Sequence, residues 1–311
     1  MIKLPDEDIK FPGIKRLTPW SFTKGNVVPV FEVLSVHALN YVVGYAKHLN
    51  RDGCTIFSRG QGRLYDNLCP SLYRGLSPTD DVAISNANAR LNAFIDSILL
   101  DKDTLVKLGF PVDASAPNLE IIEAMLQHYG VRTRMLDAVD NHWIALWFGL
   151  YEQVDEPVGG KPYALYQKRE VNAIDMAEVP VSPKDSDRVF YQYILLIAAS
   201  ESDSEPIRTL DLRLSLPQKF MRPHAQHGVM LDYQGDPAKN VLLDYSDSVV
   251  GIVRIRIDRA TQWIGSGHLI SYENLFPSRA FDNGYSVLLD NSDRFAKEFG
   301  QTITYYVYDV R

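Results

Sequence analysis

The residue types best suited to chemistry gather in one stretch of this chain, between Gln127 and Phe148. The stretch reads Q-H-Y-G-V-R-T-R-M-L-D-A-V-D-N-H-W-I-A-L-W-F. Its charged and polar side chains include a histidine, which can act as a base near neutral pH. They are His128, Tyr129, Arg132, Thr133, Arg134 and Asp137. Because charged loops between buried elements are common places for sites, the sequence predicts a site here.

Two predicted helices hold this charged loop. Asn118 is a good N-cap for an apolar helix, and Gly130 supplies the left-handed C-cap that ends it. Asn141 is an equally good N-cap for a second, aromatic helix that begins at His142. The sequence therefore predicts a tight helix–loop–helix.

An earlier segment, Cys54–Ser58, is β-prone and is bounded by glycines. It is expected to form a strand that presents Arg59, Gly60 and Gln61 at its C-terminal end. An arginine that follows a strand is often a surface ion pair or a carbonyl contact, so its position alone does not assign it a role.

The rest of the chain divides into a helical part and a strand-rich part. Helical spacing predicts helices over Val36–Leu49 and Asp81–Leu100, joined to the first helix of the loop by a connector over 101–117. After Phe148 the pattern changes to the alternation and β-branched content typical of strands. The predicted strands are Tyr163–Tyr166, Val189–Ile197, Ile207–Leu214, Val229–Tyr233, Val249–Ile257 and Thr302–Val310.

This order predicts an α+β protein with a helix-rich N-terminal half packed on a mostly antiparallel sheet. No linker is evident, so the expected organisation is a single domain over residues 1–311. Within it we expect an irregular extension over 1–33, a helical part with the first strand over 34–150, and a strand-rich part over 151–311.

Composition narrows the class of protein. The chain has 311 residues, 46% of them hydrophobic, and a formal net charge of -7, so any affinity for nucleic acid must come from a local patch. Its two cysteines, Cys54 and Cys69, have no zinc-ligand spacing and indicate a reducing compartment. Neither a signal peptide nor a membrane span is expected, which predicts a cytoplasmic location.

Six short motifs follow one another along the chain. They are Ile56–Gln61, Pro70–Arg74, Gln127–Asp137, Ala145–Phe148, Arg222 with Ala225–Val229, and Asn274–Pro277. In this order they resemble the motifs of the FRG domain family. Three departures from the family pattern affect specificity more than fold: Ser58 makes the first motif F-S-R-G, Arg132 replaces a proline, and Ala138 replaces a tryptophan.

The layout of that family is in turn similar to that of ADP-ribosyltransferases. Those enzymes clasp NAD+ in a split antiparallel sheet, and several act as toxins or in phage defence. The resemblance thus implies NAD+ as co-substrate, no metal, and a macromolecular acceptor, with RNA favoured over DNA or protein. An antitoxin protein is a possible partner.

The same resemblance implies roles for individual residues. Gln226 is placed on a late strand, and because a glutamine cannot be a general base, Asp137 would deprotonate the acceptor. The implied catalytic residues are Arg59, Gln226, Asp137 and His128. The implied NAD+ contacts are Arg59, Gly60, Gln61, Tyr73, Tyr129, Thr133 and Arg134, and the implied substrate contacts are Arg132 and Arg222.

Structural roles compete with several of these assignments. Arg134 and Asp137 can form a buried pair that locks the loop. Tyr129 at helical spacing can be a core residue, and His128 can cap a carbonyl group. His224 and His227 without a third ligand are weak evidence for a metal site.

Two other functions stay open. One is a non-catalytic module that senses a nucleotide or binds a protein, and the other is a metal-dependent hydrolase, for which Asp137 and Asp140 are the only close carboxylates near the loop. A nucleic-acid acceptor would require the candidate arginines to line one groove. These are Arg132, Arg134, Arg222, Arg254 and Arg256.

Overall fold

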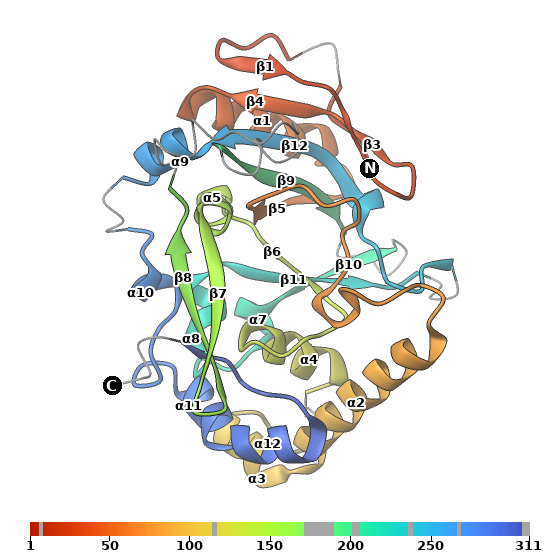
Figure 1. The fold of residues 1–311 in the computed structure, drawn as a ribbon, viewed down its shortest axis with the longest axis vertical. Helices are drawn as coiled ribbons and strands as arrows, with labels where there is room; N and C mark the ends of the chain where they lie inside the picture. The colour runs from red at the N-terminus through yellow and green to blue at the C-terminus, as the bar shows by residue number, and fades with distance from the viewer. Residues whose placement is uncertain are drawn as a thin grey trace.

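A computed structural model describes residues 1–5, 9–113, 117–170, 190–200, 206–235, 239–265 and 269–306. An eight-stranded sheet crosses the molecule (Figure 1). In spatial order its strands are β1 (Ile14–Arg16), β4 (Val30–Val33), β12 (Val249–Arg256), β9 (Tyr191–Ala199), β5 (Thr55–Gln61), β6 (Leu136–Val139), β11 (Gly228–Tyr233) and β10 (Ile207–Asp211). Neighbouring strands are antiparallel except β4 and β12, which are parallel.

Two smaller sheets accompany the large one. A three-stranded sheet has the order β13 (Tyr305–Tyr306), β8 (Lys161–Lys168) and β7 (Tyr151–Val158), and β7 and β8 form a long antiparallel hairpin. A two-stranded sheet pairs β2 (Trp20–Ser21) with β3 (Val27–Val28). Together with the helices, these sheets confirm the α+β class.

Helices pack on the large sheet and form a layer at one end of the molecule (Figure 1). Helices α1 and α5 contact the sheet, while α2, α3, α4, α11 and α12 contact one another. The helix bounds are α1 (Val36–Asn50), η1 (Ser71–Tyr73), α2 (Asp81–Leu100), α3 (Lys102–Leu108), α4 (Leu119–His128), α5 (His142–Leu150), α7 (Leu212–Ser215), α8 (Met221–Ala225), η3 (Ser246–Ser248), α9 (Ile257–Ile264), α10 (Tyr272–Leu275), α11 (Asn283–Asp290) and α12 (Ser292–Phe299).

The predicted helices that flank the charged loop are confirmed, together with their caps. The Asn118 side chain accepts a hydrogen bond from Ile121 N at 2.9 Å, and that of Asn141 accepts one from Trp143 N at 3.0 Å. Gly130 follows α4 with φ 95°, the left-handed conformation expected of it. Among the helices of the described segments, none is long and apolar enough to cross a membrane.

The large sheet divides between β5 and β6. β5 pairs with β9 along its whole length, but it meets β6 only at Ser58 and Val139. α5 packs closely on β5 at this point, since a Cβ at Gly60 would overlap the main chain of Ala145 and Gly149. The residues that follow Ser58 therefore lie at the fork of a split sheet.

Several expectations for the fold were wrong in detail. The N-terminal extension is not irregular throughout, because β4 is a fully buried strand of the large sheet. The charged loop contains the strand β6, and the connector over 101–117 contains α3. The strand-rich half also carries α7 to α11. Position 189 and positions 307–310 of the predicted strands lie outside the described residues.

Candidate functional site

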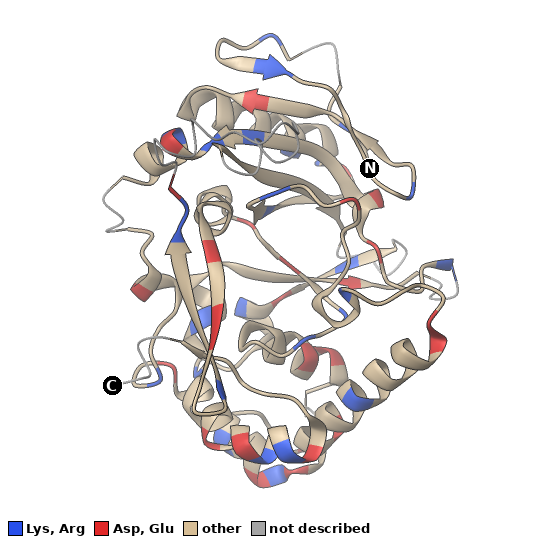
Figure 2. Cartoon of the chain, in the orientation of Figure 1, with Lys and Arg blue, Asp and Glu red and all other residues tan. Residues whose placement is uncertain are grey.

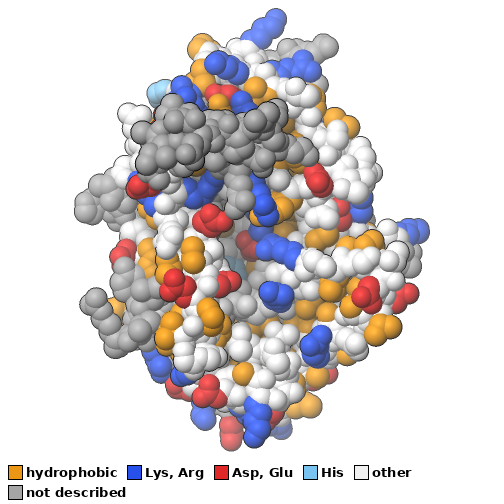
Figure 3. Space-filling model, in the orientation of Figure 1, with side chains coloured by type: hydrophobic (Ala, Val, Ile, Leu, Met, Phe, Trp, Pro, Cys, Tyr) orange, Lys and Arg blue, Asp and Glu red, His pale blue; other side chains and the backbone are white. Residues whose placement is uncertain are grey.

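A cavity of about 1140 Å³ opens between the fork of the large sheet and the β7–β8 hairpin. Its walls come from the end of β5, the loop through η1, the end of α4, β6, α5 and the small sheet. Figure 3 shows this hollow, with basic side chains along one side and acidic ones along the other. The volume slightly exceeds the ~300–1,000 Å³ that is usual for sites of drug-sized ligands, so a dinucleotide has room here.

An ion pair between Arg59 and Asp137 spans the fork. Arg59 Nη1 lies 2.5 Å from Asp137 Oδ2 and donates a hydrogen bond of 2.6 Å to the main-chain oxygen of the same residue. The Arg59 side chain is only 11% exposed, whereas that of Asp137 is 56% exposed to the cavity. Asp137 is thus held by its neighbours and still open to a ligand.

The charge state of Asp137 is set by the surrounding arginines. Partial burial raises the pKa of its carboxyl group, but Arg59 and Arg74 outweigh this and lower the pKa to about 2. At neutral pH the group is therefore a carboxylate and a weak base.

Gln127 orients the Asp137 carboxylate from the other side. Its Nε2 donates a hydrogen bond of 3.2 Å to Asp137 Oδ1, and its Oε1 accepts a short hydrogen bond from Thr133 Oγ1. Thr133 is in turn tied to the η1 segment, because its main-chain N–H donates to Ser71 Oγ at 3.1 Å. Thr133 is fully buried, so it supports the site from behind.

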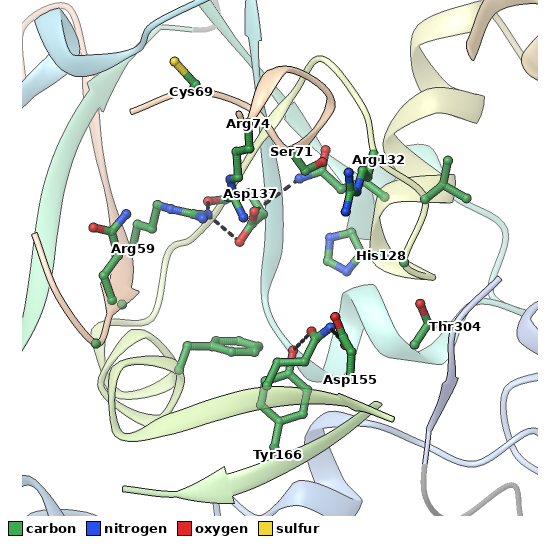
Figure 4. A pocket seen from close by; sticks show the side chains of 18 of the residues that line it. Arg59, Cys69, Ser71, Arg74, His128, Arg132, Asp137, Asp155, Tyr166 and Thr304 are labelled. Carbon is green, nitrogen blue, oxygen red and sulfur yellow. Dashed lines mark hydrogen bonds and ion pairs between the residues drawn. The ribbon is translucent and has the colours of Figure 1, made fainter. Parts of the chain in front are cut away.

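His128 ends α4 with its imidazole facing the cavity (Figure 4). Burial lowers the pKa of this histidine to about 4, and Arg222 acts in the same direction, while Asp137 and the Gln226 side chain oppose the shift. Its Nε2 is buried without a hydrogen-bond partner in the described part of the protein. The ring packs where Gly228 leaves room, since a Cβ there would overlap it. Because its pKa is about 4, His128 is neutral at pH 7.

The two walls of the cavity differ in character. Figure 4 shows Arg59, Arg74 and Arg132 on the same side as Asp137, with Tyr166 and Asp155 opposite them. The hairpin side carries acidic residues along β7 (Figure 2). It also presents the aromatic rings of Phe148, Tyr151, Tyr163, Tyr166, Phe276 and Tyr306.

Many of the predicted site residues line this cavity. Gly60, Gln61, Tyr73 and Arg132 all border it, in addition to Arg59, Asp137 and His128. Tyr73 is 4% exposed, and its hydroxyl donates to Asn88 Oδ1 at 2.7 Å. The structure thus brings together most of the residues expected to contact the ligand.

Arg134 lies outside the cavity lining and pairs with Glu123. Its Nη2 lies 2.5 Å from Glu123 Oε2, and Glu123 Oε1 also accepts from the Arg134 main-chain N–H at 2.8 Å. A buried pair of Arg134 with Asp137 was expected to lock the loop. This pairing is wrong, because Arg134 binds Glu123 and Asp137 binds Arg59. Glu123 was missed because it lies eleven residues earlier, on α4, among apolar residues.

Arg222 and Tyr129 are core residues. Arg222 is completely buried, with its guanidinium 4.7 Å from the ring centre of Tyr129, 4.5 Å from Tyr285 and 4.2 Å from Tyr306. Arg222 Nη1 donates to the main-chain oxygen of His128 at 3.0 Å. Neither side chain reaches the cavity surface as its predicted ligand-contacting role requires.

Gln226 borders the cavity, but it is not on a strand. It follows the short helix α8 and precedes β11, separated from the strand by His227 with φ 51°. Its Nε2 donates to the main-chain oxygen of Leu275 at 2.8 Å. The predicted strand position is therefore wrong by two residues.

The five candidate arginines do not line one groove. Of these five, only Arg132 borders the cavity in the described structure, while Arg134 binds Glu123 and Arg222 is buried. Arg254 pairs with Glu32 at 2.8 Å, and Arg256 pairs with Asp258 at 3.0 Å. Both lie on β12, which β9 separates from β5 in the large sheet. The condition set for a basic nucleic-acid groove is not met.

Asp140 belongs to a separate cluster. Its carboxylate accepts from Arg213 Nη1 at 2.6 Å and from His227 Nδ1 at 3.0 Å. Asp137 and Asp140 therefore do not form a metal-binding pair. Within the described segments no group of three His, Cys, Asp or Glu residues is placed to hold a metal ion.

Two residues of the site were not assigned a role from the sequence. Arg74 and Gln127 both lie in the quoted motifs, Pro70–Arg74 and Gln127–Asp137. In the sequence, their place in these motifs was the signal that could have marked both residues as part of the site. Gln127 bonds Asp137 directly, whereas Arg74 comes close to it because the η1 turn is hydrogen-bonded to the loop after α4.

Residues 55–157 match the FRG domain. The match supports the FRG resemblance, and the FRG segment contains Arg59, Gln127, His128, Arg132 and Asp137. Gln226, Phe276 at the end of α10 and Tyr306 of β13 reach the cavity from outside this segment. No curated protein and no solved structure matches the chain.

Proposed function

We propose that this protein is an NAD-dependent ADP-ribosyltransferase that modifies a macromolecular acceptor. The observation that carries the proposal is the anchored carboxylate of Asp137, held between Arg59 and Gln127 in a cavity large enough for a dinucleotide. Basic and aromatic walls flank it. They supply the two kinds of contact that phosphates and planar rings require.

In the proposed reaction the bond between nicotinamide and ribose C1′ breaks. Nicotinamide leaves with the electron pair, and the acceptor heteroatom forms the new bond to C1′ and loses its proton. Positive charge grows on the ribose in the transition state. A fixed carboxylate with a pKa of about 2 is suited to stabilise that charge, so we assign this role to Asp137.

The proton of the acceptor needs a different group. Asp137 is a weak base, whereas the neutral His128 imidazole, with a pKa of about 4, is the more basic of the two. We assign proton acceptance to His128. Gln226, which lies beside it, is a positioning residue in this scheme, since its Nε2 is already bound to Leu275 O.

The acceptor class and the biological role extend the proposal. RNA was favoured from the sequence, but the scattered arginines give it no advantage, so RNA, DNA and protein are tested together. Transfer to an essential macromolecule in the cytoplasm would make this protein a toxin of a toxin–antitoxin or phage-defence system, controlled by an antitoxin protein.

The test is release of nicotinamide from NAD+ by the purified protein, alone and with RNA, DNA or cell proteins. We expect acceptor-dependent release that is lost in Arg59→Ala and retained in Arg51→Ala, a surface control whose side chain is 57% exposed. Absence of release with intact NAD+ binding would favour the non-catalytic nucleotide-sensing module. Full activity in Arg59→Ala would overturn the assignment of this site.

A further inference from the structure

The basic wall of the cavity carries more positive than negative charge. Four arginines border the cavity, namely Arg59, Arg63, Arg74 and Arg132, together with the two carboxylates of Asp137 and Asp155. Asp137 is occupied by Arg59 and Gln127. Asp155 lies on the opposite wall and accepts from Gln153 Nε2 at 2.6 Å. The excess positive charge is therefore not neutralised from within the described structure.

Arg74 and Arg132 carry this excess. Neither forms an ion pair with a residue that the structure describes, and both guanidinium groups point toward the space around Asp137 and His128 (Figure 4). Although Arg74 as a whole is exposed, partial burial of its head group lowers its pKa, and the nearby Arg59 and Arg132 lower it further, against the effect of Asp137. An anion placed between the two arginines would relieve this repulsion.

The other two arginines are less suited to hold an anion. Arg59 Nη1 makes two contacts with Asp137, so a phosphate at Arg59 would have to compete with a carboxylate already in place. Arg63 is exposed and lies over the ring of Tyr65, 4.6 Å from its centre.

The segments that carry Arg74 and Arg132 are fixed to each other. Leu72 N donates to Thr133 O at 3.1 Å, and Thr133 N donates to Ser71 Oγ at 3.1 Å. These bonds hold the η1 turn beside the loop after α4, and they order the backbone before a ligand arrives. Such preorganisation lowers the entropy cost of binding.

We infer that Arg74 and Arg132 form a diphosphate subsite on the basic wall of this cavity. Each planar guanidinium can bind one phosphate in a bidentate manner. The identification of the ligand as a dinucleotide rests on the proposed function, and in that ligand the bases would lie toward the aromatic rings of the opposite wall. Arg59 then positions Asp137 and does not bind phosphate.

The test is calorimetry of the full chain with inorganic pyrophosphate, ADP and AMP. We expect pyrophosphate and ADP to bind, ADP about tenfold or more tightly than AMP, and Arg74→Gln or Arg132→Gln to weaken pyrophosphate binding about tenfold each. Arg74→Lys keeps the charge but loses the planar fork, so its pyrophosphate affinity should fall between those of the wild type and Arg74→Gln. Arg90→Gln is the matched control, since Arg90 is exposed on α2 and hydrogen bonds only its own helix in the described structure.

Circular dichroism and thermal unfolding show whether each variant is folded. Unchanged pyrophosphate affinity in a folded Arg74→Gln/Arg132→Gln double variant would overturn the subsite, as would failure of the wild-type protein to bind pyrophosphate. Loss of binding in the double variant without nicotinamide release by the wild type would support the subsite and refute the transferase. Nicotinamide release with an unchanged KM for NAD+ in the double variant would support the transferase and refute the subsite.

Discussion

Arg59 contacts Asp137 twice, through the carboxylate Oδ2 at 2.5 Å and through the main-chain oxygen at 2.6 Å. Ser58 and Val139 are the single residue pair that joins β5 to β6. Arg59 directly follows Ser58, and Asp137 lies two residues before Val139. The contact therefore closes the fork of the sheet and fixes a carboxylate at the base of the cavity. The proposed chemistry depends on this pair.

Replacing Asp137 by asparagine is expected to lower the kcat for nicotinamide release by roughly 10²-fold or more, because the variant cannot stabilise positive charge on the ribose. NAD+ binding should not weaken, since a negative charge near Arg74 is removed. Steady-state kinetics separates the two effects. Asp52→Asn, at a side chain that is 86% exposed, is the control. A rise in KM with unchanged kcat would contradict this role for Asp137.

Substitution of Gly60 by alanine is expected to lower the free energy of unfolding by about 3 kcal/mol or more, because the new Cβ overlaps the main chain of Ala145 and Gly149. Urea unfolding measures the loss. Gly44→Ala is the matched control, because nothing lies within 4 Å of a Cβ there. As Gly44 lies in α1, that variant should be stabilised by about 0.5–1 kcal/mol. Equal stability of the two variants would disprove the close packing of α5 on β5.

Arg222→Ala is expected to cost about 3–5 kcal/mol of stability. The substitution removes a cation from its cage of aromatic rings, leaves a cavity, and frees the main-chain oxygen of His128. Arg256→Ala, in an exposed pair with Asp258, should stay within about 1 kcal/mol of the wild type. Wild-type stability of Arg222→Ala combined with weaker binding of the macromolecular acceptor would instead support the predicted substrate contact.

Stability should fall as the pH is lowered from 7 to 4. The folded pKa of His128 is about 4, mainly because of burial, whereas an unfolded histidine titrates near ~6.5. Between these values the unfolded chain binds more protons, so the free energy of unfolding decreases by about 3 kcal/mol on account of His128. His142 contributes in the same direction, since burial and Lys47 lower its pKa to about 4.

Urea unfolding at pH 7, 6, 5 and 4 measures this dependence. In His128→Gln, the free energy of unfolding should fall less between pH 7 and pH 4, because the contribution of His128 is lost and only that of His142 remains. A pH profile for His128→Gln identical to that of the wild type would show that the imidazole is not shielded from solvent.

The helices around the site were predictable because their signals are local. The N-caps Asn118 and Asn141 and the C-cap Gly130 act within one turn of the chain, and all three perform the predicted role. By contrast, β4 and β6 were missed. Each is four residues long and gains its stability from partners far along the chain, β12 for β4 and β11 for β6.

Sequence patterns thus identified the α+β class, the helices that flank the charged loop with their caps, and several of the residues that meet in the cavity. Tertiary structure alone decided their partners. Asp137 binds Arg59 and Arg134 binds Glu123, although Arg134 and Asp137 are near neighbours in the chain. The physical reason is that a charge pairs with the group that folding brings within reach, and on a strand such as β6 that group comes from an adjacent element.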